Sequence, residues 1–268
     1  MALLLRDAML VNGVLTNAEV WFGLTQSNLK KLEEVDKIFM RQLFRVPKTC
    51  PVESFYLETG KIPLEFVIKT RRITYLHHLL TRDTGEMLYR VFEAQVENPV
   101  KNDWIIQVED DLTSFGIPKD FDFIRSFKRL KFKEYVKEKA KYAAFEALLE
   151  LKENHSKVQK LSYSTLKLQD YLFDRQITVN QARIVFKSRT RMNRYYVNFK
   201  GEHNSMLTYC PVCLDKETED SQEHSLNCEN IMQALDVRLK YEDIFMKVTP
   251  NLAAGLEKIE KYREKYLI

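Results

Sequence analysis

The stretch LEFVIKTRRITYLHHLL, residues 64–80, decides the fold class of this chain. Its apolar residues return every three or four positions, so on an α-helix they fall on one face. Pro63 precedes the stretch, and a proline suits the start of a helix. Lys69, Arg71 and Arg72 form a basic edge beside the apolar face. The stretch therefore predicts an amphipathic α-helix.

The same periodicity extends along most of the chain on both sides of this helix. Thr25 supplies a helix cap, and Pro47 and Pro51 end the following helix in a loop. Only 7 glycines and 7 prolines occur in 268 residues, so long uninterrupted helices are expected. The predicted helices span residues 2–22, 25–43, 64–80, 84–96, 102–114, 121–153 (with one break near Lys131), 164–174, 179–187 and, in one or two pieces, 231–268. The predicted fold class is mostly α.

Charge and cysteine usage say more about the cellular compartment of the protein than about its binding partner. The net charge of +4 is too small to indicate a partner by itself. Four cysteines are too few for a disulfide scaffold in a chain of this size, and three of them cluster. The fourth, Cys50, is interpreted as an ordinary thiol. Because this usage is typical of a reducing compartment, we expect an intracellular protein of the cytoplasm, the nucleus or both.

The N-terminal stretch MALLLRDAMLVNGVL resembles a signal peptide only at first sight. It lacks a basic beginning, and Arg6 and Asp7 interrupt the apolar run after three leucines. Asn12, Asn17 and Glu19 make the following residues too polar to span a membrane, and no other segment reaches membrane length. We therefore expect no membrane association.

The strongest chemical signal is the spacing C-x2-C-x10-H-x3-C near the C-terminus. Zinc takes four tetrahedral ligands of thiolate or imidazole type, and Cys210, Cys213, His224 and Cys228 supply them. A C-x2-C pair forms a tight knuckle whose backbone N–H groups point at the sulfurs, and Pro211 limits the freedom of this loop. His224 and Cys228, four residues apart, are predicted on one face of a helix.

All four ligands of this predicted site come from the protein, so no position is left for water. This arrangement predicts one structural Zn²⁺ rather than a catalytic one. The ion would stabilise a unit too small to bury much apolar surface. The residues between the ligands are mostly acidic: Asp215, Glu217, Glu219, Asp220 and Glu223 against Lys216. Because phosphate groups repel such a loop, we expect it to position its neighbours rather than to bind nucleic acid.

Residues 183–200 contain six basic residues and no acidic one. Aromatic residues are interleaved with them, and cations combined with aromatic faces suit single-stranded or looped nucleic acid. The predicted nucleic-acid-binding residues are Arg183, Lys187, Arg189, Arg191, Arg194, Lys200, Tyr195 and Tyr196. The alternative is a solvated basic face with the aromatic side chains in the core. A second basic run, residues 125–141, is more readily interpreted as a solvated helix face.

Catalytic motifs give no comparable signal. The sequence contains neither a glycine-rich phosphate loop nor a nucleophile elbow. His77 and His78 are adjacent, so on a helix their rings diverge, and we expect one in the core and one at the surface. The acidic triplet Glu109, Asp110 and Asp111 lies in a helical pattern, which argues against a Mg²⁺ site between strands. The chain by itself is predicted not to be an enzyme.

Short motifs follow one another through most of residues 3–230. They are LRD at 5–7, NAEVW at 17–21, LEEVD at 32–36, Leu43 with Pro47, YLETGKIP at 56–63, RRITYLH at 71–77, FKSRTR at 186–191 and NFKG at 198–201, followed by the cysteine cluster. In order and spacing, this series resembles the region after the polymerase palm in reverse transcriptases of non-LTR (LINE-type) retrotransposons.

The resemblance implies thumb helices followed by the C-terminal zinc-binding segment of such proteins. In that family this region helps to hold template, primer and element RNA, and the polymerase fingers and palm precede it. These parts are missing here and no nuclease signature follows Cys228, so no catalytic residue carries over. Cys210, Cys213, His224 and Cys228 carry over as zinc ligands. The implied partners are RNA or single-stranded DNA and the polymerase core of a parent protein.

The expected architecture is a thumb-like multi-helix bundle with a small C-terminal zinc-knuckle module. Its segments are a thumb-like helical region at 1–120, a basic helical linker at 121–188, a zinc-binding module at 189–232 and C-terminal helices at 233–268. The leading hypothesis is a non-catalytic, nucleic-acid-binding portion of a reverse transcriptase. Two alternatives stay open: a helical, zinc-containing adaptor that binds proteins through its acidic loop, and a nuclease with unrecognised carboxylates.

Overall fold

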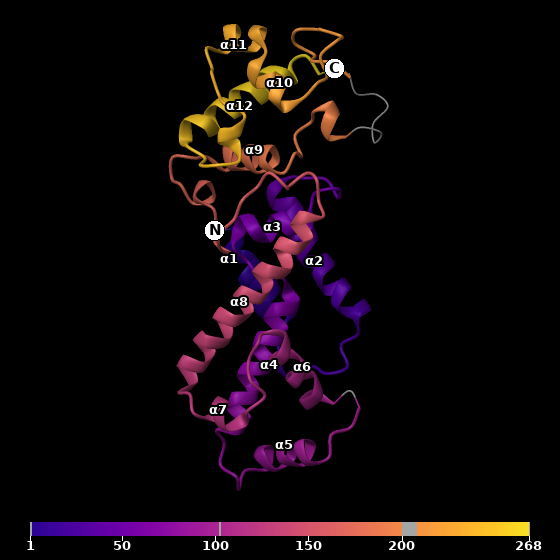
Figure 1. The fold of residues 1–268 in the computed structure, drawn as a ribbon, viewed down its shortest axis with the longest axis vertical. Coiled ribbons are helices and arrows are strands. Elements are labelled where there is room, and N and C mark those ends of the chain that lie inside the picture. Colours follow the sequence, from indigo (N-terminus) through magenta and orange to yellow (C-terminus); the bar gives the residue numbers. More distant parts are fainter. Residues whose placement is uncertain (1, 102, 200–207, 268) are drawn as a thin grey trace. The chain divides into compact units, whose positions relative to one another are not determined.

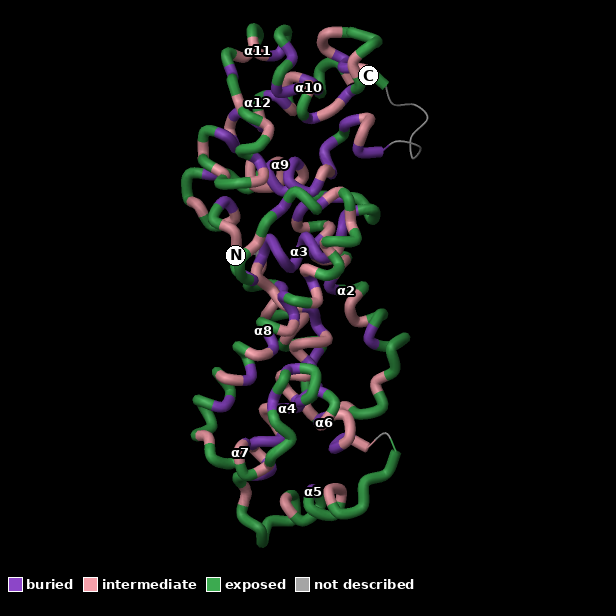
Figure 2. The backbone as a smooth tube through the Cα atoms, in the orientation of Figure 1, coloured by how far each residue is buried: buried purple, intermediate pink, exposed green. Residues whose placement is uncertain are grey.

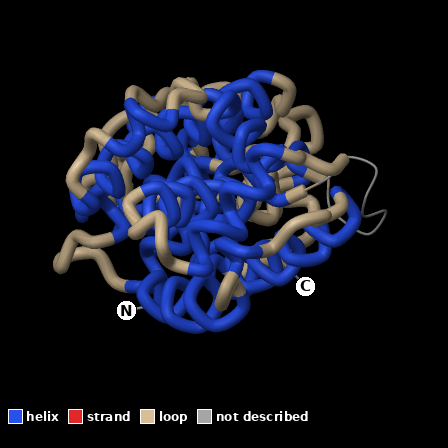
Figure 3. Tube along the Cα trace, turned by 90° about the horizontal axis from the view of Figure 1, so that it is seen from below, coloured by secondary structure: helices blue, strands red, loops and turns tan. Residues whose placement is uncertain are grey.

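The computed structural model of the chain describes residues 2–101, 103–199 and 208–267. Within these ranges it contains twelve α-helices and no β-strand (Figures 1 and 3). The predicted mostly α fold class is confirmed.

The helices vary widely in length. The α-helices are α1 (Ala2–Leu5), α2 (Gln26–Phe44), α3 (Val52–Thr59), α4 (Leu64–Leu80), α5 (Met87–Glu97), α6 (Trp104–Ser114), α7 (Phe121–Arg125), α8 (Arg129–Glu153), α9 (Val179–Arg189), α10 (Gln222–Asn227), α11 (Glu229–Leu235) and α12 (Pro250–Glu264). A wider π-helical segment is η1 (Arg6–Val14), and short 3-10 turns are η2 (Ala18–Val20), η3 (Asp170–Leu172), η4 (Tyr196–Asn198) and η5 (Glu242–Ile244).

Two compact units make up the chain, and each combines two separate stretches of sequence. The first unit consists of Met1–Met40 and Ile62–Leu148, and the second of Arg41–Lys61 and Leu149–Ile268. The four segments inferred from the sequence stay a prediction, because compactness of the backbone does not assign a role to any of them.

The core of the first unit surrounds α4, the helix predicted from residues 64–80. α4 packs against η2, α5, α6 and α7. Its side chains Ile73 and Leu76 are completely buried together with Val108, Leu112 and Phe132 from α6 and α8. Figure 2 shows the contrast with α5, most of which is exposed. The sequence periodicity therefore identified the helix around which this unit forms.

Two polar side chains of the first unit lie inside this core. Nε2 of His77 is 2.9 Å from the backbone oxygen of Phe127, so His77 is the core member of the histidine pair. Asp111 accepts hydrogen bonds from Nε and Nη2 of Arg72 at 2.7 and 3.0 Å. Asp111 is the buried residue of the acidic triplet at 109–111, and its carboxylate is thus paired with the guanidinium group of Arg72.

The prediction of one buried helix over residues 2–22 is wrong. The segment divides into α1, η1 and η2, and it leaves Leu4 and Met9 more than half exposed. The side chain that turns inward is Arg6, whose Nε and Nη2 donate to the buried carboxylate of Asp36 at 2.7 and 2.6 Å. The buried position in this segment is thus taken by a charged side chain, while apolar side chains beside it are exposed.

Two further differences concern short elements of the second unit. α3 was expected to be a loop, although Pro51 caps its start and Gly60 (φ 66°) ends it. Residues 164–174 were expected to be helical, but only the turn η3 forms there. Leu168 instead forms a β-bridge with Thr59, and this pairing holds the segment in an extended conformation. One more difference belongs to the first unit, where the predicted break near Lys131 lies a few residues earlier, between α7 and α8.

Candidate metal centre

The four predicted metal ligands lie together in the second unit. One ligand atom from each of Cys210, Cys213, His224 and Cys228 lies within 4.8 Å of all the others. Nε2 of His224 is 3.4 Å from Sγ of Cys213, so this ring nitrogen faces the sulfurs. Four atoms at this spacing can surround one ion after small side-chain adjustments. Three sulfurs and one imidazole nitrogen suit soft or borderline cations rather than Mg²⁺ or Ca²⁺.

The first two candidate ligands, Cys210 and Cys213, lie in a tight turn. The sulfur of Cys210 accepts hydrogen bonds from the backbone N–H groups of Val212 and Cys213. The carbonyl oxygen of Cys210 accepts the N–H of Leu214 at 3.0 Å, and Leu214 has the left-handed φ of 59° that reverses the chain. Backbone N–H groups therefore point at the first sulfur, as predicted.

The other two ligands do not share a helix face, so that prediction is wrong. His224 lies in α10, where its N–H donates to the capping hydroxyl of Ser221 at 3.0 Å. α10 ends at Asn227, and Cys228 is extended and begins α11. Its sulfur accepts hydrogen bonds from the N–H groups of Asn230 and Ile231 in the first turn of α11. These free N–H groups of a helix start would stabilise the thiolate form of Cys228 if a cation is bound.

Burial controls the protonation of the metal-free cluster. It raises the pKa of the Cys210 thiol to about 12, and it raises the pKa of Cys228 as well. The backbone N–H groups act in the opposite direction. The thiols of Cys210 and Cys228 are therefore neutral at pH 7 without a cation, and a metal ion bound here would displace their protons.

Asp220, in the loop between the ligands, connects the cluster to its surroundings. A β-bridge between Tyr209 and Glu219 closes this loop. Asp220 is buried, and its carboxylate accepts Nη2 of Arg263 at 2.6 Å and the backbone N–H of Tyr196 at 3.1 Å. Its backbone oxygen accepts the N–H of Val197 at 3.2 Å. Asp220 thus joins the loop between Cys213 and His224, called the metal loop below, both to α12 and to the predicted basic segment, residues 183–200.

A second contact runs between α10 and the same segment. The hydroxyl groups of Tyr195 and Ser225 share a hydrogen bond of 2.9 Å. The guanidinium carbon of Arg263 lies 3.9 Å from the centre of the Tyr195 ring. Sequence reasoning missed Arg263 and the role of Asp220, because 43 residues separate the two partners and no local pattern links them.

Two of the predicted nucleic-acid contacts lie in the interior instead. Arg189 is buried, with Nε 2.8 Å from Oε1 of Glu58 and Nη1 2.7 Å from the backbone oxygen of Ile244. Tyr195 is buried between Ser225 and Arg263. Both side chains hold the fold together, and neither reaches the surface where a phosphate group would bind.

The other predicted contacts are more accessible. Arg194 is exposed, and Arg183, Lys187, Arg191 and Tyr196 are half-buried. Nε of Arg183 donates to the backbone oxygen of Leu43 at 2.8 Å, so part of this guanidinium group is already engaged within the unit. Lys200 lies outside the described residues.

Comparisons with known proteins give no assignment. No protein-family model matches the chain, and no match is found among curated proteins or among solved structures. The resemblance to reverse transcriptases therefore rests on the sequence motifs alone. Among the described residues, no helix combines the length and the apolar character that crossing a membrane requires.

Proposed function

We propose that this chain is a non-catalytic, nucleic-acid-binding portion of a retrotransposon reverse transcriptase. A structural zinc ion at the cysteine cluster positions a basic segment on RNA or single-stranded DNA. The polymerase core of the parent protein is the second partner, and the expected location is the cytoplasm, the nucleus or both. The family part of the proposal is supported only by the order of the motifs.

The choice of zinc is supported by the donor set. Three thiolates and one imidazole are a usual ligand set of structural zinc, which prefers four tetrahedral ligands. In such a site, Zn–S bonds of about 2.3 Å place neighbouring ligand atoms about 3.7 Å apart. The longest separation in the cluster, 4.8 Å, must shorten by about 1 Å, which rotation of the half-buried Cys213 and His224 side chains supplies.

The main support for the nucleic-acid proposal is the set of hydrogen bonds between the metal loop and the basic segment. Asp220 accepts hydrogen bonds from the backbone of Tyr196 and Val197, so the loop fixes the chain that bears the cations. On this segment Arg194 is exposed and Lys187 and Arg191 are half-buried, and the exposed part of each cation can neutralise a phosphate group. In this proposal the metal fixes the position of the basic segment, and the cations of that segment contact the phosphate groups of the nucleic acid.

Fluorescence anisotropy with a labelled single-stranded RNA, repeated with DNA of the same sequence, tests this proposal. Lys187→Ala, Arg191→Ala and Arg194→Ala together should weaken binding about tenfold or more. The slope of log Kd against log salt should fall by about 0.7 for each phosphate group that the variant no longer neutralises. Binding that is absent, or that does not depend on salt, would refute the proposal.

A matched control removes the same number of charges elsewhere in the second unit. Lys240, Lys258 and Lys265 are exposed and lie outside the basic segment. Their combined change to Ala should alter Kd by no more than about twofold, because it removes only long-range attraction. An equal loss from both triple variants would mean that net charge alone governs binding.

A second candidate function is a protein-binding adaptor. Asp215, Glu217 and Glu223 are exposed on and beside the metal loop, where a basic partner protein can reach them. If this function is correct, a pull-down partner survives nuclease treatment and is lost when these three residues become Asn or Gln. The nucleic-acid proposal instead predicts that partners held through RNA or DNA are lost on nuclease treatment and that these three substitutions do not affect them.

A further inference from the structure

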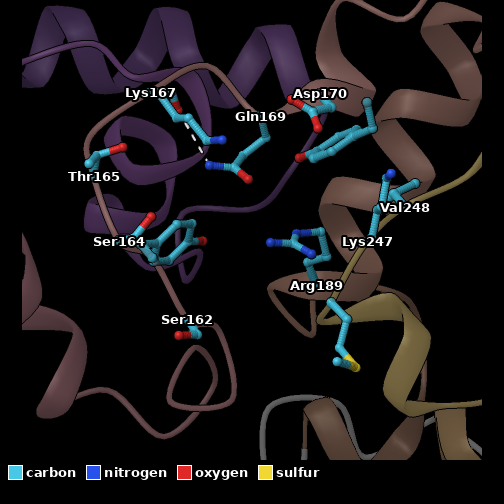
Figure 4. Close-up of a pocket in the computed structure, with 12 residues that line it drawn as sticks. Ser162, Ser164, Thr165, Lys167, Gln169, Asp170, Arg189, Lys247 and Val248 are labelled. Atoms are coloured by element: carbon cyan, nitrogen blue, oxygen red, sulfur yellow. Dashed lines mark hydrogen bonds between the residues drawn. The ribbon is translucent and has the colours of Figure 1, made fainter.

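A polar cavity of about 240 Å³ lies in the second unit beside Arg189, and the metal ligands do not line it. Figure 4 shows Lys167 and Lys247 on opposite sides of this cavity. The hydroxyl-bearing residues Ser162, Ser164 and Thr165 line it from one loop. The cavity therefore gathers hydrogen-bond donors of several kinds around one space.

The charges around the cavity favour an anion. Lys167, Arg189 and Lys247 line it against one carboxylate, that of the exposed Asp170. Arg189 is already neutralised, because its Nε donates to Glu58 at 2.8 Å. The two lysines are exposed, so the positive charge that remains available belongs to them.

A buried hydroxyl at the cavity is incompletely satisfied. Tyr171 lines the cavity and is only 3% exposed, and its hydroxyl makes no hydrogen bond of normal geometry, although the buried carboxylate of Glu58 lies close to it. A buried hydroxyl without a partner is costly, so such groups are normally satisfied by protein, water or ligand. Burial raises the pKa of Tyr171 well above its ordinary value, so the hydroxyl keeps its proton and can donate.

The walls of the cavity are fixed before any ligand binds. The loop that carries Lys167 is held by the N–H of Gln169, which donates to the backbone oxygen of Glu58 at 2.9 Å. The segment that carries Lys247 follows η5, where Arg189 donates to the backbone oxygen of Ile244 at 2.7 Å. Since Arg189 also binds Glu58, one buried ion pair holds both walls.

We propose that this cavity binds a phosphate group of single-stranded nucleic acid, between Lys167 and Lys247 and the hydroxyl of Tyr171. The lysines supply charge, and the neutral hydroxyls supply directed hydrogen bonds to the phosphate oxygens. The identity of the ligand rests on the proposed nucleic-acid function. The donor-rich lining and the buried, unsatisfied phenol do not depend on that function.

The first test compares two double variants of the full-length, metal-loaded chain. Lys167→Ala with Lys247→Ala should raise the Kd for a labelled single strand about tenfold. Lys258→Ala with Lys265→Ala removes the same charge from exposed positions and should raise it no more than about twofold. Equal effects of the two pairs on a wild-type chain that does bind would overturn the cavity site and leave the proposed function standing.

Tyr171→Phe separates binding from structure. Loss of the donor should weaken strand binding about fivefold. The unfolding temperature should change little, because the hydroxyl makes no hydrogen bond of normal geometry within the protein. An unchanged Kd, or a lower unfolding temperature with unchanged binding, would show that the phenol is structural and would refute its role in the site.

Inorganic phosphate tests the cavity without a strand. It should raise the unfolding temperature of the wild-type chain, but not that of the lysine double variant, at matched ionic strength. If no strand binds while this shift is seen, the nucleic-acid function fails and the phosphate site stands. If the shift is the same in both proteins, the site is refuted. Strands with and without a terminal phosphate then show whether an end or an internal phosphate occupies the cavity.

Discussion

Between α4 and α6, the first unit buries Ile73, Val108 and Leu112 completely, whereas around the cysteine cluster the second unit buries Asp220, Ser225 and Arg263. Burial of apolar surface is non-directional and tolerates small shifts, so many side chains share the stabilisation. Buried ion pairs and metal ligands act only in specific geometries, and a single loss leaves charged or polar groups without partners. The first unit should therefore lose stability gradually on substitution, and the cluster should lose it abruptly.

Metal removal should produce the largest difference between the two regions. Structural zinc contributes about 10–16 kcal/mol to the folding of zinc-finger peptides. A chelator, or Cys228→Ser, should abolish amide-exchange protection in α10 and α11 and leave protection in α4 and α6 unchanged. Hydrogen-exchange mass spectrometry measures both, and elemental analysis identifies the metal. Cys50→Ser is the control, because Cys50 is not part of the cluster.

Loss of protection throughout the first unit on chelation would show that the two regions do not unfold independently. Unchanged protection in α10 and α11 would show instead that the metal does not hold this region together.

Removing a buried cation should have the next largest effect. Arg189→Met leaves the Glu58 carboxylate without its guanidinium partner, and breaking a buried pair costs about 3–5 kcal/mol. Arg194→Met, five residues away and exposed, should change the free energy of unfolding by less than about 0.5 kcal/mol. Urea unfolding followed by exchange in α9 and α12 measures both variants. Similar losses in the free energy of unfolding from the two variants would mean that burial of Arg189 does not make it more important for stability than Arg194.

A cavity in the apolar core should cost somewhat less. Leu112→Ala should destabilise the first unit by about 2–5 kcal/mol without changing the metal content. Both tryptophans, Trp21 and Trp104, belong to the first unit, so their fluorescence in urea follows its unfolding. Leu130→Ala is the control, because Leu130 is 73% exposed. Release of the metal from the Leu112 variant under native conditions would contradict the proposed separation.

The smallest effect concerns one turn of the second unit. A Cβ atom added at Gly60 would lie 2.5 Å from the backbone nitrogen of Leu168, and φ at Gly60 is 66°. Gly60→Ala should therefore cost about 1–3 kcal/mol and loosen the extended segment beside α3. Gly23 has a similar φ of 63° with no atom within 4 Å of the added Cβ, so Gly23→Ala reports the backbone cost alone. Equal midpoint shifts in thermal unfolding would show that the close approach at Gly60 carries no cost.

Local patterns in the sequence were sufficient for several features. The amphipathic run at 64–80 predicted α4 almost to the residue, because helix periodicity and a preceding proline are both local signals. The cysteine spacing predicted which four side chains gather, because all four lie within nineteen residues at a spacing typical of metal ligands. The short helix α3 was missed because its eight residues, enclosed by prolines and a glycine, resemble a loop.

The tertiary structure decided which charged residues are buried. In the sequence, Arg189 and Arg194 belong to one basic segment, yet Arg189 is paired with Glu58, 131 residues away, and Arg194 is exposed. The pairing of Asp220 with Arg263 and the cavity beside Arg189 likewise join segments that are distant in the chain. Short-range spacing therefore determined most helices and the set of candidate metal ligands. Only long-range packing determined the burial of each cation, because the partner that neutralises a charge in the interior has no fixed position in the sequence.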